Sequence, residues 1–453
     1  MHVCRAWRLA ALTTPALWTR IKLMVVDRKD RQKKTCLRVS EGYEVCSTPN
    51  QLSRALQRVG SVPLDLWIFV SEFSWRTAYQ GAYDTARVDV MSLVDLMKKQ
   101  LLQPRLRSLR IQNPSGFQLG DWFDDFTFRD LKSFDVDRSY PNLFKKVAKE
   151  VGNLQALTAP APDVLSLKPK LSHIEELGLL RSYGVAHESV EAFLDSSDSL
   201  TALTLQGSII GSNSKTALPG LRRLNLWDVP NAWPIESANL THLTIRAYTE
   251  HTIQHIYLPD LVHLSYTGDS GKFLGSFEVP ALYTLELTID GRKSDTARGT
   301  RSVWINNPNH MINPVVFKLF GTKINSKHLA KVLEAMTNCE EFYSKKTMIH
   351  ADLFSSLVPE KNIDKLKAKK KPSVTRDSKP KGTWRVPAPK LRIIVGDMSG
   401  CRAKLDESEL WVAARNFVAA RESASIPLDE LSLRLDGGGW KDFVTDDLED
   451  RDI

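Results

Sequence analysis

The sequence predicts an α/β fold in which short parallel strands stack into a curved sheet, with helices and irregular segments on the convex side. The main observation is a leucine pattern that recurs at regular spacing, with helical patterns between some of its copies. Apolar residues make up 42% of the chain and charged residues 25%, which is ordinary for a folded protein. No apolar run reaches the roughly 18 residues that a membrane-spanning helix needs.

The recurring pattern is x-L-x-x-L-x-L. Nine copies begin at Leu106, Leu131, Leu154, Ile174, Leu200, Leu221, Leu240, Leu261 and Leu282. Successive first positions differ by 25, 23, 20, 26, 21, 19, 21 and 21 residues. Periods of about 20–29 residues with this pattern are typical of leucine-rich repeats. The sequence therefore predicts a leucine-rich-repeat solenoid, whose stacked units build a long concave surface suited to holding another protein.

Side chains alternate between the two faces of a strand, so the leucines point inward and the residues between them face the concave side. The candidate partner-binding residues on that side are Arg110, Asp135, Asn225, Trp227, Arg246 and Glu286. Because Trp and Arg are enriched at binding hot spots, Trp227 with Arg246 is the favoured centre. The alternative, that these residues only face water, stays open.

Helices are expected where apolar residues recur at helical spacing. They are expected at 51–59, 189–195, 352–357 and 407–421. A further helix is expected to be capped by Ser326 and to carry Leu329, Val332, Leu333 and Met336 on one face. The units between Leu221 and Leu287 are too short for a full helix, so extended or 3₁₀ segments are expected there. Further strands are expected at 62–68, 339–342, 391–394 and 428–433.

Residues 2–23 read as two short helices, the second beginning at Pro15 after a threonine cap. This run, VCRAWRLAALTTPALWTRIKL, resembles the second half of an F-box of the large fungal F-box family. The resemblance is carried by Val3, Cys4, Arg5, Trp7, Arg8, Ala10, Pro15, Leu17 and Trp18, and the helix at 51–59 followed by the strand at 62–68 also matches the family. It implies a substrate receptor of a cullin-type ubiquitin ligase.

The chain differs from that family where the F-box would open. The L-P-x-E helix that docks on the ligase adaptor does not precede Val3. Two explanations stay open: a start codon assigned too late, or a protein that has lost adaptor binding. We expect the chain as given to bind the adaptor weakly or not at all, since an interface without one of its helices loses several kcal/mol, roughly, of apolar burial.

The sequence divides into five parts. They are a partial F-box-like helical segment (1–23), a leucine-rich-repeat-like solenoid (24–360), a basic disordered insertion (361–387), C-terminal repeat units (388–440) and an acidic tail (441–453). Residues 361–392 hold twelve Lys or Arg against two Asp, so this segment has a net charge of +10. The whole chain has a net charge of +9, so the remaining residues together carry −1. The basicity therefore belongs to one segment.

The basic segment has three interpretations. It can be a solvated low-complexity loop, a nuclear-import patch formed by Lys367, Lys369, Lys370 and Lys371, or a nucleic-acid contact. The last is the weakest, because Trp384 is the single aromatic residue in 361–392 and stacking platforms for single strands need several.

The sequence shows no pattern for catalysis, a cofactor or a metal. His251 and His255 lack the glutamate of a metalloprotease motif, and the stretch from Gly207 to Thr216 lacks the lysine directly after its second glycine that a phosphate loop needs. The five cysteines lie far apart and are odd in number, which favours reduced thiols in the cytoplasm or nucleus. The N-terminus shows no signal-peptide pattern.

These observations predict a non-catalytic, monomeric interaction protein that binds a target protein on its concave surface, as a ligase substrate receptor does. The alternatives are a ligase-independent scaffold and, more weakly, a nucleic-acid-associated protein acting through 361–392.

Overall fold

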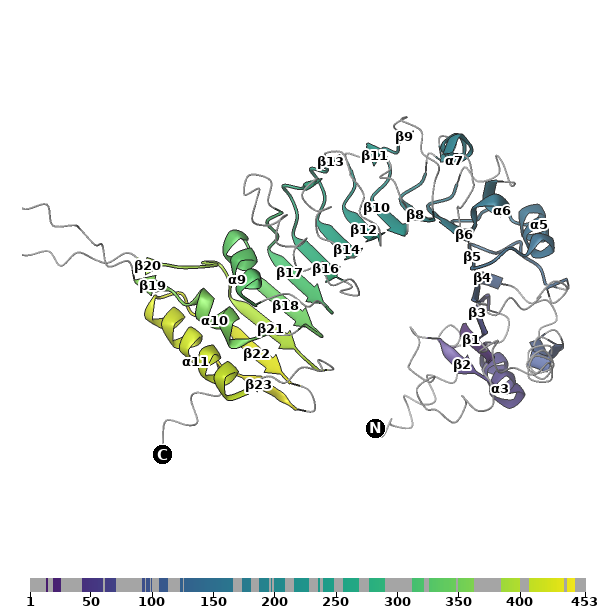
Figure 1. Cartoon of the computed structure of the whole chain (residues 1–453). Coiled ribbons are helices and arrows are strands. Elements are labelled where there is room, and N and C mark those ends of the chain that lie inside the picture. Colours follow the sequence, from purple (N-terminus) through teal and green to yellow (C-terminus); the bar gives the residue numbers. More distant parts are fainter. Residues whose placement is uncertain are drawn as a thin grey trace, which may run out of the picture. The chain divides into compact units, whose positions relative to one another are not determined.

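The computed structural model describes Thr14 and, with short gaps inside some ranges, residues 19–25, 43–70, 92–99, 106–112, 123–165, 173–180, 187–207, 216–227, 235–247, 256–268, 277–289, 312–361, 384–399 and 407–444. The chain forms two compact units. Unit 1 is Met1–Leu221 with Trp233–Glu236, and unit 2 is Arg222–Ala232 with Ser237–Ile453. Both are mixed α/β structures built on a parallel sheet (Figure 1).

The sheet of unit 1 contains eight described parallel strands. They are β1 (Arg20–Val25), β2 (Glu44–Cys46), β3 (Leu64–Val70), β4 (Leu106–Gln112), β5 (Ser133–Val136), β6 (Ala156–Pro160), β7 (Glu176–Leu180) and β8 (Ala202–Gln206). From β3 onward each strand pairs with the next in the chain. At the amino-terminal end β1 lies between β2 and β3. Strand β2 is therefore farther from β3 in the sheet than β1 is, although β2 follows β1 in the chain.

The inward residues of unit 1 form a continuous ladder of apolar side chains. Leu66 lies opposite Leu109, Leu109 opposite Phe134, and Phe134 opposite Leu157. All four are at most 1% exposed. The helices α5 (Pro141–Glu150), α6 (Ala161–Leu165) and α7 (His187–Leu194) follow β5, β6 and β7. A short parallel pair, β9 (Thr216–Ala217) with β11 (Ile235–Glu236), also belongs to this unit.

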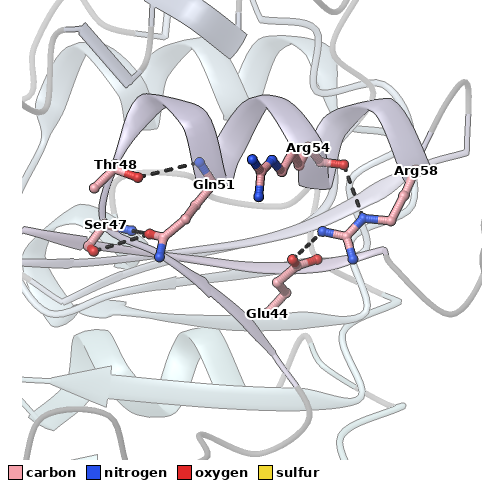
Figure 2. Close-up of polar contacts among 6 residues, drawn as sticks. All are labelled: Glu44, Ser47, Thr48, Gln51, Arg54 and Arg58. Atoms are coloured by element: carbon pink, nitrogen blue, oxygen red, sulfur yellow. Dashed lines mark hydrogen bonds and ion pairs between the residues drawn. The ribbon is translucent and has the colours of Figure 1, made fainter. Parts of the chain in front are cut away.

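Helix α3 (Pro49–Val59) is held at its start by residues just after strand β2 and at its end by a residue of β2 (Figure 2). Thr48 accepts a hydrogen bond from the Gln51 backbone N–H at 3.4 Å, and the Gln51 side chain accepts one from the Ser47 backbone N–H at 3.0 Å. This is a reciprocal cap, with Pro49 at the first helical position. At the other end the Arg58 guanidinium donates to the Glu44 carboxylate in β2, which fixes this edge strand.

The sheet of unit 2 contains nine described strands, eight of them parallel. They are β10 (Arg223–Trp227), β12 (His242–Ala247), β14 (His263–Gly268), β16 (Thr284–Ile289), β17 (Val316–Phe320), β18 (Glu341–Lys345), β21 (Ile393–Asp397), β22 (Glu430–Arg434) and β23 (Trp440–Asp442). Strand β23 runs antiparallel to β22 and closes that edge. Its neighbour Phe443 is 2% exposed and contacts Trp411 of helix α11 (Glu407–Ser423), with ring centroids 5.3 Å apart.

Unit 2 has short extended segments outside its sheet in its first part and helices in its later part. Opposite the main sheet, β13 (Ile256–Tyr257) pairs with β15 (Phe277–Glu278). After β17 come α9 (Ser326–Ala335), α10 (Ala351–Leu357) and α11 (Glu407–Ser423), which cover one face of the neighbouring strands (Figure 1). Phe354 of α10 and Phe417 of α11 meet at 5.8 Å between centroids. In the described residues between Leu221 and Leu287, the segments outside the main sheet include the extended pairs Ile235–Glu236, Ile256–Tyr257 and Phe277–Glu278, as expected.

The nine predicted repeat strands are all present, as are the helices expected in the described residues. Some boundaries were wrong. Strand β1 begins at Arg20, so the helical segment predicted for 1–23 cannot extend to its end. Ser326 lies inside α9 rather than capping it, and its hydroxyl accepts a hydrogen bond from the His350 backbone N–H at 3.0 Å.

The predicted disordered insertion and acidic tail also began or ended at the wrong residues. Glu360–Lys361 (β19) pairs antiparallel with Trp384–Arg385 (β20), so both ends of the 361–387 segment belong to the folded structure. The tail predicted from 441 onward includes the end of β23 and the buried Phe443. In both places strand pairing orders residues whose composition alone indicates disorder: β19 with β20 across 22 residues, and β23 with the preceding strand β22.

Candidate partner-binding surface

The strands of unit 2 bring the predicted concave residues into register. Asn225 lies opposite Thr244, and Trp227 lies opposite Arg246. The same two rows continue through Ser265 and Thr267 of β14 and Glu286 and Thr288 of β16. The intervening residues, Leu224 and Leu243 among them, are 1% and 3% exposed. The sheet of unit 2 therefore has one buried apolar face and one polar face.

Trp227 and Arg246 form a direct contact on the polar face. The Arg246 guanidinium carbon lies 4.7 Å from the centroid of the Trp227 ring, a cation–π geometry. Trp227 is half-buried and Arg246 is exposed. The indole Nε1 is buried and bonds to no described residue, so this indole presents its ring rather than its N–H. Rigid aromatic area beside an exposed guanidinium is typical of a binding hot spot.

Glu286 is held by neighbours that sequence reasoning did not single out. Its carboxylate accepts from Lys318 of β17 at 2.9 Å and lies 3.8 Å from Nε2 of His263. The His263 ring contacts the His242 ring, with centroids 5.7 Å apart. Burial lowers the pKa of His263, Glu286 opposes this, and His242 and Lys318 add to it. Glu286 is thus part of an internally paired cluster.

In unit 1 the predicted residues Arg110 and Asp135 pair with each other. The Arg110 Nε lies 3.1 Å from an Asp135 carboxylate oxygen, and the two stand opposite each other in β4 and β5. Burial raises the pKa of Asp135, while Arg110 lowers it and Asp137 raises it. A charge pair already satisfied in this way offers less to a partner than an unpaired charge.

The same face of unit 1 carries an aromatic cluster around Trp67 of β3. The Arg110 guanidinium carbon lies 4.5 Å and the Lys22 ammonium 3.4 Å from the centroid of the Trp67 ring. Tyr43 meets the ring edge-on at 5.4 Å. Trp67 is only 7% exposed and Lys22 8%. Trp67 falls in the strand predicted at 62–68, but this cluster was not predicted; the alternation in Leu64–Val70 was the available signal.

Several predicted residues lie outside the described part of the chain. These are the F-box-like residues Val3, Cys4, Arg5, Trp7, Arg8, Ala10, Pro15, Leu17 and Trp18, and the import-patch residues Lys367, Lys369, Lys370 and Lys371.

The cysteines within the described ranges are buried thiols. Burial raises the pKa of both Cys46 and Cys339 to about 12, which makes them unreactive at neutral pH. Among the residues that the structure describes, no group of three or more His, Cys, Asp or Glu is placed to hold a metal ion. None of the described helices is long and apolar enough to cross a membrane.

No protein-family model matches the chain, and no curated protein matches it in sequence. The surface itself therefore carries the functional argument. The strongest candidate on it is the Trp227–Arg246 contact, which combines an aromatic platform with an exposed cation.

Proposed function

We propose that this chain is a leucine-rich-repeat solenoid that binds a target protein on the polar face of its sheet. The observation that carries the proposal is the Trp227–Arg246 contact, at 4.7 Å, on a face whose other positions in β10–β16 are mostly small and polar. Small neighbours leave such a pair accessible, and desolvating it on binding strengthens the contribution of both residues.

The resemblance to F-box proteins supports a more specific role. A substrate receptor has no chemistry of its own and needs only a rigid surface for a target, together with a segment that docks on the ligase adaptor. Copurification with the adaptor distinguishes this role from that of a ligase-independent scaffold with the same binding face. The described residues do not include the F-box-like segment, so this part of the proposal rests on the sequence.

Site-specific photocrosslinking tests the binding face. A photoreactive amino acid replaces Thr244, which lies beside Asn225 in the first row and two residues before Arg246 on β12, or Lys331 on the exposed side of α9 as the control. We expect a discrete crosslinked protein from the first position only. The double variant Trp227→Ala with Arg246→Ala should then weaken binding of that protein by at least about 2 kcal/mol, roughly thirtyfold.

The matched control is Lys331→Ala with Arg415→Ala, two exposed cations on α9 and α11. This control should leave binding of the target protein unchanged. The control and the Trp227 and Arg246 variant should both keep the melting temperature of the parent protein. Equal crosslinking from both positions, or unchanged binding by the Trp227 and Arg246 variant, would place the interaction elsewhere.

A further inference from the structure

A second set of charged residues lies on the polar face of unit 2, at the carboxyl ends of its last strands. Phe320, Lys345, Asp397, Arg434 and Trp440 stand opposite one another in that order on β17, β18, β21, β22 and β23. We call these five residues the carboxyl-end row. Adjacent strands lie about 4.8 Å apart, so the row spans about 19 Å.

The cations of this row, Lys345 and Arg434, stand on either side of one carboxylate, Asp397, but form no ion pair with it. Among the described residues no ion pair is formed by Lys345, Lys346 or Arg434, whereas Lys318, Arg107 and Arg392 elsewhere on the strands are each paired with a carboxylate. Lys345 and Lys346 are exposed and Trp440 is 52% exposed. Unpaired cations beside an exposed indole are positioned to meet an anion from outside.

Asp397 is ionised and offsets one of the two cations of the row. Its carboxylate already accepts a hydrogen bond from the Ser399 backbone N–H at 3.0 Å. Hydrogen bonding with Ser399 lowers the pKa of Asp397, and nearby Arg434 and Lys345 lower it further. The row therefore holds two cations against one carboxylate, and the exposed Lys346 adds a third cation beside it.

The opposite ends of the same strands are acidic. Glu341 begins β18 and Glu430 begins β22. Between them and the carboxyl-end row lies Tyr343, whose hydroxyl donates to Glu341 at 3.0 Å. Burial raises the pKa of Tyr343, and Glu341 and Glu430 raise it further. An anionic ligand is thus attracted to one end of the strands and repelled from the other, which sets its position.

We infer that the carboxyl-end row binds an acidic, aromatic-containing polypeptide segment of a partner protein. The inference rests on the proposed function and names the chemistry of the partner. Lys345 and Arg434 are two strands apart, about 10 Å, so a segment that crosses the strands can present a carboxylate to each of these long side chains. Phe320 and Trp440 at the two ends of the row provide apolar surface for aromatic side chains. A polypeptide can supply both the carboxylates and the aromatic side chains, whereas a nucleic acid would supply phosphates and bases.

Fluorescence anisotropy with a labelled peptide of repeated Glu-Tyr pairs tests the inference on the full chain at low ionic strength. We expect saturable binding that Lys345→Glu with Arg434→Glu weakens at least about tenfold, and that Trp440→Ala also weakens. Lys331→Glu with Arg415→Glu changes the net charge equally but lies on α9 and α11, so it should leave affinity within about twofold. A Lys-Tyr peptide should not bind.

The inference is overturned if the Glu-Tyr peptide does not bind, or if the control variant loses affinity equally. Preferential binding of an oligothymidylate that depends on Lys345 and Arg434 would overturn it in favour of nucleic acid. Peptide binding that appears only after residues 445–453 are removed would overturn it in favour of the acidic tail as occupant. A partner crosslinked at Thr244, with no peptide binding, would sink this inference and leave the proposed function standing.

Discussion

Lys361 and Trp384 stand directly opposite each other in the antiparallel pair of β19 and β20, although twenty-two residues separate them in the chain. Paired strands lie about 5 Å apart, a distance that a two-residue hairpin turn bridges. The segment 362–383 can therefore be replaced without moving either strand.

We predict that substituting Asn-Gly for residues 362–383 leaves the melting temperature of unit 2 unchanged or slightly higher, because a shorter loop costs less closure entropy. Differential scanning calorimetry measures this. A matched replacement that also removes β19 and β20 should lower the melting temperature. Loss of soluble protein with the first replacement would show that 362–383 contributes to folding.

The register of the sheet predicts a contrast within one strand. Leu224→Ala should lower the free energy of unfolding by about 2–5 kcal/mol, since it removes a side chain that is 1% exposed from the core. Leu243→Ala, opposite it in β12, should behave in the same way. The exposed Arg223→Ala, one residue away, should cost less than about 0.5 kcal/mol. Chemical denaturation that found the same loss for both kinds of substitution would contradict the register.

Arg421 of α11 is expected to stabilise the carboxyl-terminal repeats by satisfying backbone carbonyls. It is 1% exposed and donates to Leu391 at 2.7 Å, Ile426 at 3.1 Å and Ala388 at 3.2 Å. Arg421→Lys cannot reach three carbonyls with one ammonium and should cost at least about 2 kcal/mol. The control is Arg415→Lys on the exposed side of the same helix. Equal denaturation midpoints for the two variants would show that these hydrogen bonds contribute nothing net.

His263 predicts a pH dependence. Its folded-state pKa is lowered, first by burial and then by His242 and Lys318, with Glu286 opposing. The unfolded chain therefore binds a proton more readily, so stability falls as pH drops through the ordinary histidine pKa of 6.5 toward the lower folded value. His263→Gln should flatten the melting temperature between roughly pH 7 and 5, the range where histidine titrates.

The exposed His173 gives the control for this measurement, since His173→Gln should leave the slope as in the parent. A steeper slope for the His263 variant would mean that the contact with Glu286, and not burial, controls the titration.

The alternation of leucines determined much of this protein from sequence alone. The inward positions Leu109, Leu224 and Leu285 are each at most 1% exposed, because a period of two places one face of a strand in the core whatever lies farther along the chain. The same local logic located α9, α10 and α11. It also placed Trp227 and Arg246 at matching positions of two repeats, from which their contact follows.

Only the tertiary structure decided which polar residues are already paired. Lys22 lies over Trp67, and Lys318 meets Glu286, because strand order and register bring together residues that no local pattern relates. β2 lies outside β1, β19 pairs with β20, and Asp397 stands between Lys345 and Arg434 for the same reason. Periodicity determines which face a side chain occupies, whereas its neighbours on that face depend on which strands pair across long separations in sequence.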